Sequence, residues 1–265
     1  PRRDERNHDC EARQDHQQDE QRRYVIDDDV RIRTPGGVLL PAMLVRPRNA
    51  AALPTLLEFT IYLDPRNDAK ECAAHGYVGV VAYTRGRLIT GGHVLPYEHD
   101  GADARAVIGW IARQPWSDGR VGMYGSGYSA FTPWAAMKRR VPALKAVATF
   151  SAIAPGISAP RLGNVYLNSA YRWARYVTGT DPASDAEYAD LAHWDSLDQT
   201  WYRSGRRYQD LPRIDGAPSA VFSRWLAHPG YDRYWQAMIP YRQEFAHVQI
   251  PVLSITGYYD SNEPG

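Results

Sequence analysis

The stretch VGMYGSGYSAFTPW, residues 121–134, decides how the rest of the chain is interpreted. It begins with a short apolar run, passes through a turn that contains Gly125 and Gly127, and continues into a segment that we expect to be helical as far as Arg140. Small residues at Gly125, Gly127 and Ala130 would let the strand and the helix approach each other closely. The stretch therefore predicts a strand, a tight turn and a helix.

Two kinds of site use a turn of this shape. One binds phosphate through glycine-rich backbone, and the other presents a nucleophile at the tip of the turn, the nucleophile elbow. The spacing does not fit G-x-x-x-x-G-K-[ST], and Ala130 occupies the third glycine position of G-x-G-x-x-G. The elbow fits better, although by itself the pattern is weak.

The sequence around this stretch alternates between buried strands and helices. Thr34-Pro35-Gly36-Gly37 lies between two apolar segments and predicts a hairpin. The expected strands are 54–60, 78–84, 120–125, 145–150 and 250–256, and the expected helices are 64–75, 99–116 and 128–140. Strands that alternate with helices indicate a mostly parallel sheet with helices on both faces.

Residues 157–245 interrupt this alternation. They contain Trp173, Trp194, Trp201, Trp225 and Trp235, which are five of the eight tryptophans of the chain. The segment is expected to be a helical insertion. Its aromatic side chains would pack a small core of their own, and some would line a pocket where the insertion meets the sheet.

Composition excludes several classes of function. The 265 residues carry a net charge of +1, which gives no electrostatic reason to bind nucleic acid or an anionic membrane. No apolar run approaches the roughly 18–20 residues that span a bilayer. Since the numbering begins with Pro1, the compartment stays open between the cytoplasm and export after removal of a leader.

The segment 1–23 is strongly polar, with 13 residues that are Asp, Glu or Arg, and is expected to be a disordered arm or a fraying helix. His8 and His16 in this arm could bind a metal, but a solvated role is the expected one, and no metal or organic cofactor is implied. Cys10 lies in the same arm, whereas Cys72 is expected to be buried in a helix. Two cysteines argue against a disulfide framework.

Five segments resemble, in the correct order, the X-Pro dipeptidyl-peptidase/cocaine-esterase family of α/β-hydrolases. They are QPWSDGRVGMYGSGYSAFTPW (114–134), EFTIYLD (58–64), HGYVGVVAYTRGR (75–87), WLAHPGYDRYW (225–235) and IPVLSITGYYD (250–260). The resemblance implies an α/β-hydrolase core over 24–156 and 246–265, with a helical cap over 157–245. It also implies hydrolysis of an ester, an amide or a short peptide through an acyl-enzyme.

The family's site residues carry over with one conspicuous departure. The position of the nucleophilic serine falls on Gly127, which has no side chain to attack a substrate. Tyr62 falls on the oxyanion-hole tyrosine, the backbone N–H of Tyr128 on the second oxyanion donor, and Asp260 on the triad acid. Ser126 is a weaker substitute nucleophile, because the elbow presents one side chain and its neighbour points elsewhere.

The triad histidine of an α/β-hydrolase comes after its acid in the chain, and no histidine comes after Asp260 in these 265 residues. We therefore expect a chain truncated before the last elements of the fold and inactive as written. The alternatives are a non-catalytic, ligand-binding pseudo-hydrolase and a fragment of a longer hydrolase. The incomplete sheet is expected to favour self-association near residues 252–256.

Overall fold

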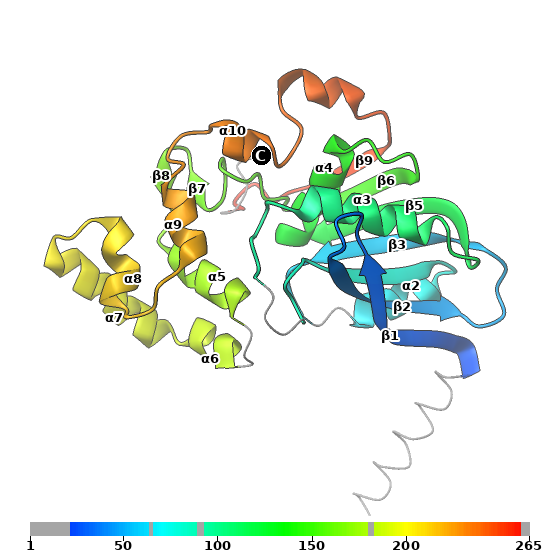
Figure 1. Ribbon diagram of the computed structural model, residues 1–265, viewed down its shortest axis with the longest axis horizontal. Helices are drawn as coiled ribbons and strands as arrows, with labels where there is room; N and C mark the ends of the chain where they lie inside the picture. The colour runs from blue at the N-terminus through cyan, green and yellow to red at the C-terminus, as the bar shows by residue number, and fades with distance from the viewer. Residues whose placement is uncertain (1–21, 64–65, 89–92, 180–182, 261–265) are drawn as a thin grey trace, which may run out of the picture.

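The computed structural model describes residues 22–63, 66–88, 93–179 and 183–260 (Figure 1). The predictions for the arm up to residue 21, with His8, Cys10 and His16, lie outside the described residues. The arrangement is an α/β fold in which a mixed, mostly parallel sheet stands beside a group of helices.

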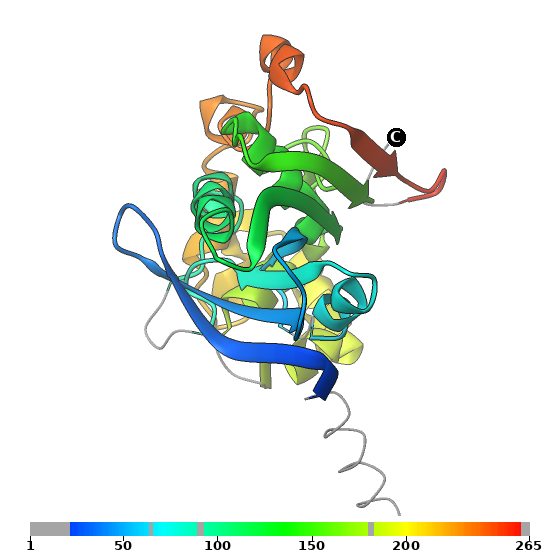
Figure 2. The same ribbon diagram turned by 90° about the vertical axis from the view of Figure 1, so that its right-hand side faces the viewer.

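The central sheet has seven strands in the order β1-β2-β4-β3-β5-β6-β9. Their bounds are β1 Tyr24–Arg33, β2 Leu39–Pro47, β3 Leu53–Thr60, β4 Val78–Tyr83, β5 Ser117–Ser126, β6 Leu144–Phe150 and β9 Val252–Ile255. The strands β4, β3, β5, β6 and β9 run parallel, and β1 and β2 add an antiparallel hairpin at one edge. Figure 2 shows that hairpin and β9 at opposite ends of the sheet.

Helices cover both faces of the sheet, as the alternating pattern predicts. Helix α2 (Arg66–Ala74) packs on one face, where Ala69 and Ala73 contact a cluster that includes Val81 of β4. Helices α3 (Asp100–Ile111) and α4 (Tyr128–Lys138) cover the other face. The apolar spacing predicted for α3 is confirmed, because Ala104, Val107, Ile108 and Ile111 are all buried in the main core.

Between β6 and β9 the chain forms helices and one small hairpin, β7 (Arg161–Leu162) with β8 (Val165–Tyr166). The longer helices are α5 Ser169–Thr178, α6 Ala183–Ala189, α7 Leu191–Ser204 and α9 Ala220–Leu226. Short turns are η1 Tyr208–Asp210, α8 Leu211–Ile214, α10 Arg233–Gln236 and η2 Arg242–His247. The hairpin was not expected from the sequence, and the domain boundaries at 157 and 245 stay a prediction.

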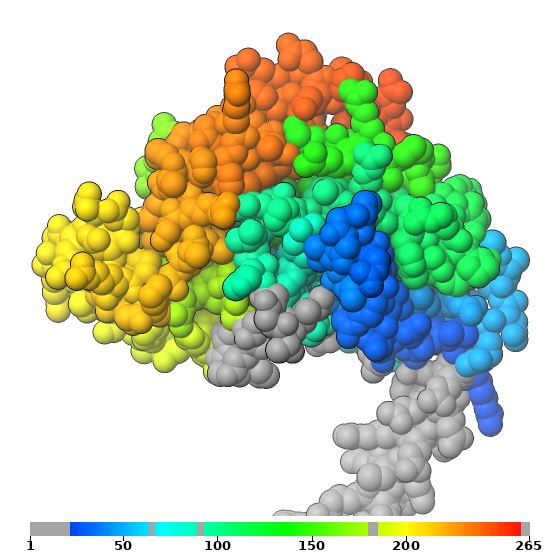
Figure 3. Space-filling model, viewed as in Figure 1, coloured from blue at the N-terminus to red at the C-terminus, as the bar shows by residue number. Residues whose placement is uncertain are grey.

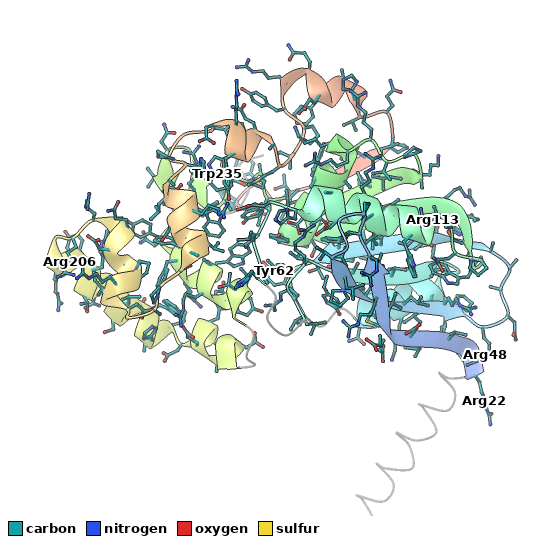
Figure 4. All side chains as sticks on the ribbon, in the orientation of Figure 1. Arg22, Arg48, Tyr62, Arg113, Arg206 and Trp235 are labelled. Carbon is teal, nitrogen blue, oxygen red and sulfur yellow. The ribbon has the colours of Figure 1, made fainter. Side chains whose placement is uncertain are left out.

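The aromatic side chains of this helical segment do not form a separate core. Phe222, Trp225 and Trp235 are buried in one cluster together with Tyr128 and Phe131 of α4. The helical segment is therefore joined to the sheet by shared packing at the end where α4 begins. Figure 4 places Trp235 in the helical segment and Tyr62 between it and the sheet.

The sheet ends in an exposed strand. Val252, Leu253 and Ile255 of β9 are all exposed, and β9 pairs only on its β6 side among the described residues. Self-association through this edge stays a prediction. In the described part of the chain, no helix combines the length and the apolar character needed to cross a bilayer.

Candidate functional site

Gly127 occupies the turn between β5 and α4, as predicted, and has φ 56° and ψ −114°. This backbone region is costly for residues with a Cβ and accessible to glycine. The turn is held by the neighbouring strand, because the Gly127 N–H donates to the Phe150 carbonyl at 3.0 Å. The Gly127 carbonyl in turn accepts the N–H groups of Ala130 and Phe131 at 3.2 Å each.

The two glycines of the elbow have opposite surroundings. A Cβ on Gly125 would lie 2.4 Å from the backbone oxygen of Ser129, so only glycine allows strand and helix to approach this closely. A Cβ on Gly127 would meet no atom within 4 Å. The position that the family resemblance assigns to the nucleophile thus faces open space, and it carries no side chain to project into that space.

Helix α4 begins with the backbone N–H groups of Tyr128 and Ser129, which have no acceptor within the helix. The N–H of Tyr128 is the one that the family resemblance implies as an oxyanion-hole donor. The helix N-terminus also carries partial positive charge, which favours an anionic or strongly polarised ligand oxygen. The Tyr128 side chain points away into the protein and is fully buried.

A buried network fixes that side chain. The Tyr128 hydroxyl donates to Asp100 at 2.9 Å and accepts the backbone N–H of Tyr97 at 3.0 Å. Asp100 also accepts from the Thr84 hydroxyl at 2.7 Å, and burial raises the pKa of its carboxyl to about 6. Sequence reasoning missed Asp100, because one acidic residue at the start of a helix is typical of ordinary surface helices.

Tyr62 lies just beyond the C-terminal end of β3, and its ring packs edge-on against that of Tyr128 with 6.3 Å between centroids. Its hydroxyl accepts the indole N–H of Trp173 from α5 at 3.1 Å. Burial raises the pKa of Tyr62 to about 12, so the phenol stays protonated and can donate a hydrogen bond. Tyr62 therefore stands between the elbow and the helical segment.

Asp260 lies beyond the C-terminal end of β9, and Gly127 lies beyond the C-terminal end of β5. Because these strands run parallel, both residues lie on the side of the sheet where the strands end. Its carboxylate accepts the hydroxyl of Ser151, the residue directly after β6. Ser151 also donates its backbone N–H to the Ile255 carbonyl at 2.8 Å, and it has a φ of 48°. Because β6 pairs with β5, Ser151 connects the acid to the elbow strand.

Ser126, the weaker substitute nucleophile, is the last residue of β5 and is exposed. It pairs across the sheet with Phe150. Ser126 still belongs to β5, whereas Gly127 is the residue at the tip of the turn, so the Ser126 side chain does not start from the position of the turn residue. Among the described residues, no group of three or more His, Cys, Asp or Glu side chains could hold a metal ion.

Glu58 is an acidic residue of β3 that the sequence did not single out. Its Oε2 atom is buried and has no hydrogen-bond partner in the described part of the chain. Burial raises the pKa of Glu58 to about 7, the nearby Ser129 hydroxyl partly lowers it, and the charge of Asp68 adds to the rise. Glu58 thus lies beside the first turn of α4 as a carboxyl that resists ionisation.

This environment predicts a pH dependence of stability. The pKa of Glu58 is higher in the folded state than its ordinary value of 4.5, so its stabilising contribution is present at low pH and is lost as the pH rises toward and through about 7. The unfolding free energy of the wild type should fall between pH 5 and pH 8. In Glu58→Gln this fall should be smaller by about 2–3 kcal/mol. Urea unfolding at both pH values measures it.

The matched control is Glu71→Gln in α2, which should change the pH profile by no more than about 0.5 kcal/mol, because its pair with His75 is exposed on both sides. Asp100 contributes to the slope in both proteins, so the comparison between the variants isolates Glu58. An identical profile for wild type and Glu58→Gln would show that Glu58 is ionised in the folded protein.

The mixed, mostly parallel sheet, the tight turn after β5 and the helices on both faces give the chain an α/β-hydrolase-type fold. The chain belongs to the X-Pro dipeptidyl-peptidase (S15) family, whose model matches residues 36–264. It is 28% identical over 255 residues to the cocaine esterase of Rhodococcus sp. (strain MB1 Bresler), covering 89% of this chain and 44% of that enzyme.

Solved structures share the fold. An aminopeptidase from a marine sediment Thaumarchaeota archaeon has a TM-score of 0.62 at 20% identity, covering 89% of this chain and 43% of its own. A CocE/NonD family hydrolase from Staphylococcus aureus has a TM-score of 0.60 at 17% identity, covering 86% and 40%. The chain thus spans less than half the length of each of these relatives. The expected family and fold class are confirmed.

Proposed function

We propose that this chain is a ligand-binding member of the S15 serine-hydrolase family that forms no acyl-enzyme at its elbow. One observation carries the proposal: the residue at the tip of the elbow is Gly127, which has the turn geometry of a nucleophile position and no nucleophile. A histidine supplied from any other part of a longer protein could activate a serine, but it could not activate a glycine.

We infer that the groups around the open space would hold a ligand. We assign the N–H of Tyr128 and the hydroxyl of Tyr62 as donors to the carbonyl oxygen of an ester, an amide or a short peptide. Asp260, held by Ser151, would accept a hydrogen bond or pair with an amino group of the ligand. The aromatic side chains of Trp173 and Tyr176 border Tyr62 and would pack against apolar ligand groups.

The expected cost of losing the nucleophile is large. Removing the catalytic serine of a well-studied serine protease lowers kcat by roughly 10⁶-fold, and the oxyanion site alone retains roughly 10³–10⁴-fold over water. Turnover at a rate typical of a serine hydrolase is therefore not expected from this chain.

A fluorophosphonate probe tests the proposal, because it reacts covalently with an activated serine. The wild-type chain should remain unlabelled by intact-mass measurement. Labelling that disappears in Ser126→Ala would show that Ser126 replaces the nucleophile and would contradict the proposal. Labelling that persists in Ser126→Ala would place a reactive serine outside the elbow and would contradict the purely ligand-binding role.

Ligand binding is tested separately by thermal unfolding with phenyl acetate and with the dipeptide amide Gly-Pro-NH₂. A ligand at 100 times its Kd should stabilise the chain by about 2.7 kcal/mol. Tyr62→Phe, which removes one proposed donor but keeps the ring packing, should weaken the effect. No stabilisation by either probe would favour the alternative that the chain is a piece of a longer hydrolase.

A further inference from the structure

A groove of about 430 Å³ lies on the molecule away from the elbow, between the turn of the β1–β2 hairpin and helix α3. The hairpin lies against the surface of α3 in Figure 3. The helix side of the groove is lined by Ala102, Ala106 and Gly109, which are spaced so that they share one face of α3. Because these residues are small, the helix face is hollow where longer side chains would otherwise fill it.

Three arginines surround this hollow helix face. Arg105 belongs to α3, and Arg113 lies in the turn just after the helix ends. Arg33 is the last residue of β1 and lines the groove from the hairpin side. No carboxylate lines the groove, and among the described residues none of the three forms an ion pair with an acid. Arg85 gives the contrast, since it is paired through two hydrogen bonds with Asp103.

The few hydrogen bonds of these arginines leave most of their donors available. Arg33 donates to the Gly37 carbonyl at 3.2 Å, and Arg105 donates to the Arg139 carbonyl at 3.5 Å. A guanidinium carries five N–H donors, so each bond occupies a small part of its capacity and helps to fix its position. The second bond joins the Arg105 side chain to the backbone of Arg139, whose own side chain lies against Gly101 of α3.

The concentration of positive charge is local. The whole chain has a net charge of only +1, so the cluster of arginines at the groove does not simply reflect a basic surface overall. Guanidinium groups match phosphate in geometry and bind it through paired hydrogen bonds. The groove therefore has the chemistry of an anion site and the volume of a small-molecule site rather than of a nucleic-acid surface.

The spacing of the arginines sets the size of the ligand. Arg105 and Arg113 are separated by eight residues, but Arg113 turns back along the helix, because its Nη1 lies 3.5 Å from where a Cβ on Gly109 would stand. Its guanidinium therefore lies about 6 Å along the helix from Arg105, a separation that suits neighbouring phosphate groups of one ligand. We propose that this groove binds a polyphosphate, such as the di- or triphosphate portion of a small molecule. Arg105 and Arg113 contact its two ends, and Arg33 contacts it from the hairpin. The site is independent of the function proposed for the elbow.

Calorimetric titration of the intact chain in about 150 mM salt with inorganic tripolyphosphate tests the proposal. We expect saturable binding at one site, at least about tenfold tighter than the binding of inorganic phosphate. Equal affinities for phosphate and tripolyphosphate would contradict the two-ended ligand, and no binding at this salt concentration would overturn the site.

Variants that each remove one positive charge test whether the tripolyphosphate binds in this groove. Arg105→Gln and Arg113→Gln should each weaken tripolyphosphate binding by about tenfold or more. Arg206→Gln is the matched control, because Arg206 is exposed at the far end of the helical segment from Arg113 (Figure 4). Equal losses in all three would mean that net charge alone attracts the anion, which would overturn the site. Unchanged thermal unfolding of each variant without ligand shows that the fold is intact.

Discussion

Replacing Gly125 with alanine is expected to lower the free energy of unfolding by about 3 kcal/mol or more. The added Cβ would lie 2.4 Å from the Ser129 oxygen and 2.5 Å from its carbonyl carbon. Both are backbone atoms in the first turn of α4, so no side chain can rotate away to relieve the contact. The strand and the helix would have to separate. Urea unfolding, followed by circular dichroism, measures the loss.

Gly127→Ala is the matched control in the same turn. Its Cβ would meet no atom within 4 Å, so the only cost is the left-handed backbone at φ 56°, about 1–2 kcal/mol. The two substitutions add the same methyl group two residues apart. Equal losses would show that backbone conformation, rather than close approach of strand and helix, decides which residues the elbow accepts.

Trp225→Ala is expected to cost about 3–5 kcal/mol of unfolding free energy. Trp225 is 1% exposed, and its ring stacks on that of Trp173 with 5.8 Å between centroids. It also packs against Tyr97, which belongs to the loop before α3. Its loss would leave a cavity between the helical segment and the sheet. Since Trp173 donates to Tyr62, the same substitution should also weaken ligand binding at the elbow.

Tyr202→Ala in α7 serves as the control, because Tyr202 is a large aromatic residue of the same helical segment that is 80% exposed. Its removal should change stability by no more than about 0.5 kcal/mol. Guanidinium unfolding monitored by near-ultraviolet circular dichroism compares the two. A similarly small change for Trp225→Ala would mean that the helical segment is not held to the sheet by this stack.

The sheet was predictable because its strands are short, apolar and separated by clear turns. The run VGVVAY of β4 is buried at every position, and the hairpin turn closes as expected through a bond from the Thr34 N–H to the Val38 carbonyl at 2.8 Å. Cys72 is buried in α2, also as expected. The β7–β8 hairpin was not predictable, because strands of two residues carry no alternating pattern.

The candidate site was predictable only where a residue falls in a recognisable segment. Gly127, Tyr62 and Asp260 lie in such segments, and all three are found at the edge of the sheet where the strands end. The residues that contact these three, or that hold the helix beside them, could not be predicted in this way. Asp100, Ser151 and Trp173 act through contacts between residues distant in sequence, so no local pattern indicates them. The roles of all these residues stay predictions.

The pairing of β6 with β9 has a consequence for how the chain folds during synthesis. Val147 of β6 pairs with Val252 of β9, and Phe150 pairs with Ile255. The ribosome must therefore complete the helical segment before the second edge of β6 can pair with β9. Closing so long a loop costs only slightly more entropy than closing a short one, but contacts between distant residues slow folding. Until then β6 offers an open edge to other nascent chains. We expect chaperone demand to be greatest in this interval.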